Sequence, residues 1–208
     1  MFEIDHIPVW TPGRDGALQR LSEATGLPIL EGFAPDGRRV ARGVRFSNGP
    51  FLDVHEAPGD GPAFLALADG VYAAEALAAR EGWRTRTERR SPDPDAAPWS
   101  ILSFRRGQGL LTLLFVIDYA PEPGAWTSPI FNGGLYHWRA GEGAALRRVW
   151  LAAADLDSGG AALEALGFLR GDEVHSSSPP GSGRLYRGGR ADIVLSAGGD
   201  ALVLFDVE

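Results

Sequence analysis

One pattern occurs three times along the sequence, and this repetition constrains the fold more than any other feature. Each copy begins with an extended stretch and continues into an Ala- and Leu-rich stretch with helical spacing. A glycine followed by an apolar residue ends each helical stretch, as a left-handed helix cap requires. The extended stretches are residues 5–10, 63–69 and 146–157, and the glycines are Gly26, Gly82 and Gly167.

Turn signals in the second half of each copy separate apolar runs and indicate antiparallel strands. These signals are Asn48-Gly49, Gly107-Gln108-Gly109 and Gly198-Gly199. The repeating unit is therefore a strand, a helix and two or three antiparallel strands. We predict units one and two within residues 1–118, a connector at 119–144 and a third unit at 145–208. The connector fits no unit, but its aromatic content is too high for a disordered linker.

Composition excludes several classes of function. The 208 residues include no cysteine and no lysine, which rules out disulfides, thiolate metal sites, Schiff-base lysines and phosphate loops of the Walker type. A net charge of −7 argues against nucleic acid as a partner. No apolar run is long enough to span a membrane, and no glycine-rich stretch has the spacing of a nucleotide-binding loop. We therefore expect no nucleotide cofactor. The N-terminal stretch lacks the features of a secretory signal, so we expect a cytoplasmic protein.

The stretch FLDVHE, which begins at Phe51, carries three ionisable groups among strand-forming residues. Side chains alternate across a strand, so Asp53 and His55 share one face with Phe51. Leu52 and Val54 share the other face and suit the core. Asp53 and His55 therefore look either into solvent or into a site.

The repeated unit resembles the units of the vicinal-oxygen-chelate superfamily, in particular the glyoxalase-like domain proteins of bacteria. The resemblance covers most of the chain and rests on the opening Asp5-His6, the glycine-ended helix and a final strand of Leu-acid-apolar type. The strand LLFVIDY, followed by FNGG, and the third opening, RRVWLAAADLD, are also similar to segments of the family. The resemblance implies an α+β fold in which βαββ(β) units form curved, mostly antiparallel sheets around a cavity. The superfamily includes lyases, epimerases, dioxygenases and metal-free binding proteins, and its members often form homodimers.

In metal-using members of the superfamily, the ligands come from the first and last strands of each unit. The resemblance therefore implies that His6 and Asp53 hold a divalent ion such as zinc, manganese, iron or nickel. Such an ion would polarise the oxygens of a small oxygen-rich substrate in a lyase, isomerase or dioxygenase. Asp118 and Asp206 stand near the last-strand positions of the other units and are candidates for a third ligand or a general base. The other candidates for a third ligand are His55 and His137.

Arg148 leads to a different interpretation, because it takes the place that a histidine has in the family. An arginine in a cavity lined by aromatic residues binds a carboxylate or phosphate through a bidentate contact. The protein is then a metal-free small-molecule binding protein of the bleomycin-resistance type. In that case the residues that contact its ligand are Arg148, Trp10, His55 and His137. Two structural interpretations also stay open: a backbone carbonyl satisfies His6, or an arginine such as Arg45 pairs with Asp53.

Overall fold

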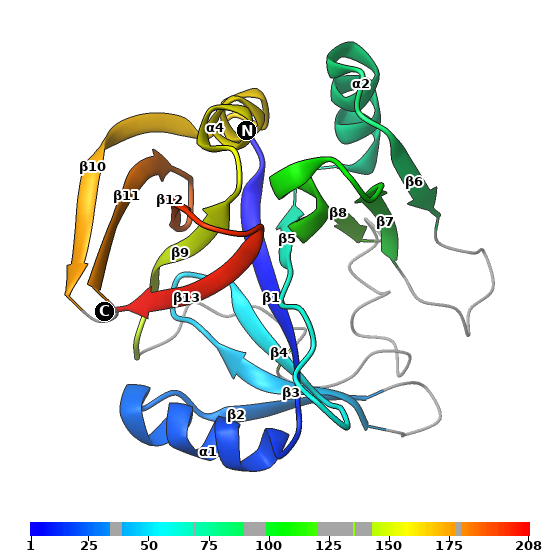
Figure 1. The fold of residues 1–208 in the computed structure, drawn as a ribbon. Helices are drawn as coiled ribbons and strands as arrows, with labels where there is room; N and C mark the ends of the chain where they lie inside the picture. The colour runs from blue at the N-terminus through cyan, green and yellow to red at the C-terminus, as the bar shows by residue number, and fades with distance from the viewer. Residues whose placement is uncertain (34–38, 69, 90–98, 120–134, 136–142, 178–179) are drawn as a thin grey trace.

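The computed structural model describes residues 1–33, 39–68, 70–89, 99–119, 135, 143–177 and 180–208. The three predicted units are present in it, each as a strand, a helix and three further strands (Figure 1). The first comprises β1 (Glu3–Thr11), α1 (Arg14–Thr25), β2 (Ile29–Phe33), β3 (Arg39–Arg45) and β4 (Phe51–Glu56). The second comprises β5 (Leu65–Ala68), α2 (Val71–Glu81), β6 (Thr85–Glu88), β7 (Trp99–Phe104), the 3-10 helix η1 (Gly109–Leu113) and β8 (Leu114–Tyr119). The third comprises β9 (Leu146–Ala153), α4 (Leu156–Ala165), β10 (Leu169–Ser177), β11 (Pro180–Arg187), β12 (Asp192–Ala197) and the additional β13 (Ala201–Val207).

The strands form two open, mixed sheets. The first two units share an eight-stranded sheet in the order β2-β3-β4-β1-β5-β8-β7-β6, and the third forms a five-stranded sheet in the order β10-β11-β12-β9-β13. In every unit the fourth strand pairs in parallel with the first, as β4 does with β1, β8 with β5 and β12 with β9. The other pairings are antiparallel. The predicted α+β class with mostly antiparallel sheets is therefore confirmed.

The turns at Asn48-Gly49 and Gly107-Gln108-Gly109 join strands that pair with each other, as predicted. The hairpin predicted at Gly198-Gly199 is wrong, because β12 and β13 lie on opposite sides of β9. The reason is that β12 already occupies one edge of β9 in parallel, so β13 pairs antiparallel with the other edge. Strand β13 thus stands beside β9 as β5 stands beside β1.

Glycines end the first two helices as predicted. Gly26 and Gly82 adopt the left-handed conformation with φ of 72° and 70°, which glycine reaches without steric cost. In the third unit Leu166 caps α4 in the right-handed conformation, and the positive φ of 95° falls on Gly167. No helix among the described residues is long and apolar enough to cross a membrane.

The two sheets share one hydrophobic core. Ile4 and Ile7 of β1, Val149 and Leu151 of β9, and Leu163 of α4 all belong to it and are fully buried. Burial of each such side chain stabilises the fold by roughly 1.5–3 kcal/mol. The N-terminal end of β1 lies beside α4 (Figure 1), so the core joins the third unit to the first.

Asn48 also links the first unit to the third. Its side-chain amide donates hydrogen bonds to the carbonyl oxygens of Leu146 (2.8 Å) and Arg190 (2.7 Å). Its side-chain oxygen accepts a hydrogen bond from the backbone N–H of Leu146 at 3.0 Å. One turn of the first unit therefore fixes the start of β9.

Candidate functional site

A row of rings crosses the first sheet on the face opposite the shared core. His6 of β1 is in register with Phe51 of β4 on one side and with Ala66 of β5 on the other, and Ala66 is in register with Phe115 of β8. The rings of His6 and Phe51 stack with centroids 4.6 Å apart and an interplanar angle of 10°. Phe115 meets His6 edge-on, with centroids 5.5 Å apart. The strand register therefore places the ring of His6 between the rings of Phe51 and Phe115.

A carboxylate holds one nitrogen of His6. Oδ2 of Asp5 lies 2.6 Å from Nδ1 of His6 and also accepts a hydrogen bond from the hydroxyl of Tyr119 at 2.5 Å. Burial raises the pKa of Asp5, but the hydrogen bond and charge of His6, the Tyr119 hydroxyl and the charge of Arg45 together bring it below its usual value. An ionised Asp5 favours a proton on Nδ1 of His6. No described residue forms a hydrogen bond with Nε2.

Sequence reasoning missed Asp5 as a partner of His6. Strand alternation places neighbouring residues on opposite faces, so Asp5 and His6 are expected to point apart. The register between β1 and β5 shifts between Ile4 and His6, and this irregularity brings both polar side chains together. The hydrogen-bond partner of Nδ1 is therefore a side chain, and the interpretation that a backbone carbonyl pairs with His6 is wrong.

Arg45 of β3 extends the row beyond Phe51. The two residues are in register, and the guanidinium carbon lies 5.2 Å from the centroid of the Phe51 ring. Nη1 donates a hydrogen bond to the carbonyl oxygen of Leu135 at 2.5 Å. Burial lowers the pKa of Arg45, and the charge of Asp5 partly offsets this effect. Since Arg45 forms no ion pair with Asp53 among the described contacts, the predicted Arg45–Asp53 pair is wrong.

Asp53 and His55 face the same side as His6, as strand alternation predicts. Oδ2 of Asp53 lies 3.2 Å from Nε2 of His55, and the ring of His55 stacks on Trp10 with centroids 5.0 Å apart. Leu52 and Val54 on the same strand belong to the shared core. Asp53 is 9% exposed, and its Oδ1 is buried without a hydrogen-bond partner among the described residues. This oxygen can accept a hydrogen bond or bind a cation.

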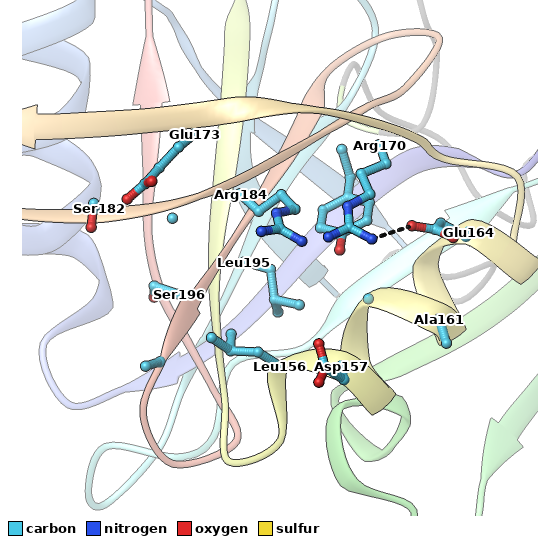
Figure 2. A pocket seen from close by; sticks show the side chains of 14 residues that line it. Leu156, Asp157, Ala161, Glu164, Arg170, Glu173, Ser182, Arg184, Leu195 and Ser196 are labelled. Atoms are coloured by element: carbon cyan, nitrogen blue, oxygen red, sulfur yellow. Dashed lines mark ion pairs between the residues drawn. The ribbon is translucent and has the colours of Figure 1, made fainter.

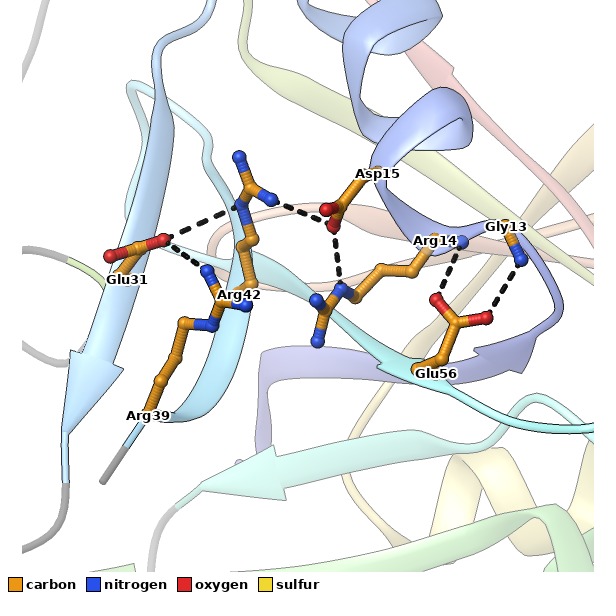
Figure 3. A network of polar contacts seen from close by, with 7 residues as sticks. All are labelled: Gly13, Arg14, Asp15, Glu31, Arg39, Arg42 and Glu56. Atoms are coloured by element: carbon orange, nitrogen blue, oxygen red, sulfur yellow. Dashed lines mark hydrogen bonds and ion pairs between the residues drawn. The ribbon is translucent and has the colours of Figure 1, made fainter.

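Glu56, the next residue, serves the helix on the other side of the sheet (Figure 3). Its carboxylate accepts hydrogen bonds from the backbone N–H groups of Gly13 (2.9 Å) and Arg14 (3.1 Å). These are unpaired donors at the start of α1, where a negative charge is also favourable. Ion pairs continue along the surface from Arg14 through Asp15, Arg42, Glu31 and Arg39. Glu56 therefore anchors the strand end next to His55 and does not face the site.

Two predicted residues are not brought to His6. On β8, Phe115 faces His6, while Val116 belongs to the shared core. Alternation places Asp118 on the face of Val116, away from His6. His137 lies outside the described residues.

Arg148 occupies on β9 the register position that His6 occupies on β1. His6 is in register with Phe51, the first residue of β4, and Arg148 with Asp192, the first residue of β12. The resemblance implied that Arg148 takes the place of a histidine. The register agrees with this, because Arg148 and His6 hold equivalent positions on β9 and β1. The two residues lie on different sheets, so Arg148 does not share a face with His6.

The surroundings of Arg148 include Trp150, which belongs to a small buried cluster with Leu185 and Val194. Asp206 of β13 is in register with Arg148, but its Oδ2 accepts a hydrogen bond from the indole N–H of Trp150 at 2.8 Å. No described carboxylate lies within ion-pair distance of Arg148, and its Nε is buried without a described partner. Asp206 therefore holds Trp150 on the second sheet and does not approach His6.

The donor types present near β1 and β4 suit a divalent cation in part. Nε2 of His6 and Oδ1 of Asp53 are a nitrogen and an oxygen that no described residue engages. The part of the chain that the structure describes contains no group of three or more His, Cys, Asp or Glu residues that could hold an ion. The described residues thus supply two donor atoms without partners and no complete metal site.

No protein-family model matches the chain, and no curated protein sequence matches it. Solved structures do. A hypothetical protein from Staphylococcus aureus is 10% identical, with a TM-score of 0.63 over 97% of this chain and 88% of that chain. A mutant of 4-hydroxymandelate synthase from Streptomyces coelicolor is 17% identical, with a TM-score of 0.61 over 94% of this chain and 63% of that chain. An extradiol ring-cleaving dioxygenase from B. fuscum is 15% identical, with a TM-score of 0.62 over 99% of this chain and 56% of that chain. At these identities, the similarity establishes a shared fold and nothing about activity.

Proposed function

We propose that this chain, which has the fold of the vicinal-oxygen-chelate superfamily as its sequence suggested, binds a small oxygen-rich metabolite on the His6 face of its first sheet. His6 would exchange a proton with the bound molecule, as an isomerase or lyase requires. The arrangement around Asp5 carries this proposal. Asp5 is hydrogen-bonded to Nδ1 of His6 and to Tyr119, which orients the ring and leaves Nε2 as the proton acceptor.

The residues around His6 support a small ligand with a planar, oxygen-bearing group. Phe51 and Phe115 flank the imidazole, and Trp10 stacks on His55 further along the same face. Aromatic walls with a few fixed polar groups are typical of small-molecule sites. Arg45, next to Phe51, supplies the positive charge in this row and suits a carboxylate group on the ligand.

A metal-dependent lyase, isomerase or dioxygenase is the second candidate, favoured by Oδ1 of Asp53. This buried oxygen and Nε2 of His6 are both without described partners, and they are the two ligands that the sequence implies. A bound divalent ion would polarise the oxygens of the ligand. The aromatic walls and Arg45 orient the ligand in the same way whether or not an ion is bound.

Metal content separates the two candidates. Untagged wild type, His6→Ala and Asp53→Ala are incubated with zinc, manganese, nickel or iron, desalted and measured by mass spectrometry. About one ion per chain in wild type, lost in both variants, establishes the metal-dependent candidate. Wild type without an ion after every incubation overturns it. His175→Ala is the matched control, because His175 is exposed on β10 of the other sheet.

Proton exchange tests the first candidate directly. Small 2-oxo and 2-hydroxy acids are incubated with the protein in D₂O, and NMR records deuterium that enters at C3 of the 2-oxo acids or at C2 of the 2-hydroxy acids. Exchange in wild type and in His175→Ala, lost in His6→Ala, supports the role of His6. Binding of these acids without exchange would instead identify a metal-free binding protein, the alternative that the sequence left open. If the acids neither bind nor exchange at the His6 face, both the proton-exchange function and the binding function are overturned.

A further inference from the structure

A hollow lies on the third unit, whose sheet does not contain His6. It is a groove of about 470 Å³ between α4 and the adjacent side of β10, β11 and β12 (Figure 2). This volume falls within the roughly 300–1,000 Å³ that small-molecule sites occupy. Its lining is largely polar and comes from four elements of one unit.

The side chain of a buried tyrosine lines this groove. Tyr186 of β11 is only 2% exposed and lines the groove, and its hydroxyl forms no hydrogen bond with any described residue. Burial raises the pKa of Tyr186, so the hydroxyl keeps its proton and is a donor near neutral pH. An oxygen of a ligand in the groove would accept a hydrogen bond from it.

The helix opposite Tyr186 is shaped around this hydroxyl. Gly160 lies within α4, where glycine is about 1 kcal/mol less favourable than alanine. A Cβ at Gly160 would collide with the Tyr186 hydroxyl. The helix thus gives up intrinsic stability at the one position where a side chain would block the hydroxyl.

Two arginines approach the groove from neighbouring strands. Arg170 of β10 and Arg184 of β11 both line the groove, and their guanidinium groups are labelled in Figure 2. Arg170 has a long ion pair with Glu164, with the nitrogen and oxygen 3.8 Å apart, and Arg184 has no ion pair with a described residue. The two arginines favour an oxyanion, because guanidinium groups bind carboxylate and phosphate through paired hydrogen bonds.

Carboxylates stand around the same groove. Asp157 is in the first turn of α4, Glu164 is near its end, and Glu173 is on β10. These groups disfavour a simple polyanion and favour a ligand that also carries a positive charge. The lining therefore matches a small zwitterion.

We propose that the groove between α4 and strands β10–β12 is a second ligand site, which binds a small zwitterion with one oxyanion group and one ammonium group. Arg170 and Arg184 bind the oxyanion, the Tyr186 hydroxyl donates a hydrogen bond to it, and the surrounding carboxylates attract the ammonium group. The site is independent of the chemistry proposed for His6, since it shares no residue with that face.

Titrations followed by amide NMR test this site with three probes: L-serine, O-phospho-L-serine and inorganic phosphate. Shifts are expected at Gly160, Gly183 and Tyr186 with the zwitterions. L-serine and phosphoserine distinguish a carboxylate from a phosphate as the oxyanion. Arg184→Gln is expected to weaken binding by about tenfold or more, since it removes a charge-assisted contact, and Tyr186→Phe by roughly three- to tenfold. Both arginines are exposed enough for Arg184→Gln and Arg170→Gln to fold normally.

Arg187→Gln is the matched control, because Arg187 is an exposed arginine on β11 whose side chain alternation places on the opposite face from Arg184. The proposal is overturned if neither zwitterion shifts the groove amides of wild type. It is also overturned if Arg187→Gln weakens binding as much as Arg184→Gln does. Phosphate that binds as tightly as phosphoserine overturns the role of the carboxylates. Loss of the zwitterion shifts in Arg170→Gln and Arg184→Gln, with Arg187→Gln unchanged, supports it.

Discussion

The first and second sheets contain the same unit but use its central position differently. In the first sheet, β1 and β5 pair at the centre and join two complete units. In the second, β9 pairs with β13, which is the edge strand of the described sheet. The equivalent register position is His6 on β1 and Arg148 on β9. His6 has a carboxylate on one nitrogen, whereas Nε of Arg148 is buried without a described partner.

This difference shows that the strand arrangement determines where the central residue of a unit lies. The residues around that position determine its chemistry. Asp5 and Tyr119 fix one side of the His6 ring, and the proposed proton exchange depends on this arrangement. Arg148 cannot exchange a proton near neutral pH, because a guanidinium stays charged. The same scaffold position thus favours proton transfer in one sheet and a fixed positive charge in the other.

The largest effect is expected from Asn48→Ala, which tests whether the two sheets fold as one unit. The change removes three hydrogen bonds, two to Leu146 and one to Arg190. We expect a loss of about 2–4 kcal/mol in the free energy of unfolding. Urea unfolding followed by circular dichroism and tryptophan fluorescence measures it, and both probes should report a single shifted transition.

Ser47→Ala is the control for this change. Ser47 lies in the same turn, but its hydrogen bond to Ala144 comes from the backbone and survives the substitution. Its effect should stay within about 0.5 kcal/mol. Two separate transitions in the Asn48 variant would mean that the sheets unfold independently, and the comparison between them would lose its basis.

A smaller effect with a defined pH dependence is expected from Asp5→Asn. The pKa of Asp5 in the folded chain lies below its ordinary value of 3.8, so ionised Asp5 stabilises the fold. This contribution is fully present above the unfolded pKa and is lost as the pH falls through the folded pKa. Wild type should exceed Asp5→Asn by roughly 1–3 kcal/mol at pH 6, and the difference should shrink below about pH 4.

Urea midpoints measured from pH 6 to pH 3 give this difference. Asp15→Asn serves as the comparison: the pKa of Asp15 is also lowered, through its hydrogen bond to Arg14, but its side chain is mostly exposed. We expect a weaker pH dependence for that variant because solvent screens exposed pairs. A gap between wild type and Asp5→Asn that stays constant over this range would contradict an ionised Asp5 beside His6.

Local patterns predicted much of this architecture because they depend on neighbours in sequence. The helix-ending glycines and the alternation in FLDVHE each express a backbone rule within a few residues, and the structure confirms the three units and the faces of Asp53 and His55. The partners of His6 escaped prediction for two reasons. Asp5 depends on a register shift between two strands, and Tyr119 lies more than a hundred residues away.

Long-range pairing also explains the failure at Gly198-Gly199. The turn chemistry suits a hairpin, but the parallel pairing of β12 with β9 decides where the next strand can go. By sequence, Asp206 stands near the last-strand position of the third unit, the position that Asp53 has in the first. Instead, β13 stands where β5 stands, so Asp206 belongs to a different strand position. The sequence shows two consecutive glycines at 159–160, inside α4. The reason for Gly160 lies on another strand, because a Cβ there would collide with the hydroxyl of Tyr186.

The smallest effect, with the opposite sign, is expected from Arg148→Met. Methionine has a similar length and removes a charge whose Nε is buried without a described partner, next to the apolar cluster of Trp150. Since replacing buried charge by apolar volume is often neutral or favourable, we expect a gain of about 0–1 kcal/mol in the free energy of unfolding. Arg147→Met is the control, because Arg147 is exposed and its ion pair with Glu208 is long, with 3.6 Å between nitrogen and oxygen. That variant should change stability by less than about 0.5 kcal/mol. A loss of more than about 1 kcal/mol in Arg148→Met alone would mean that the arginine is held by the fold as firmly as His6 is, and the contrast between the two sheets would disappear.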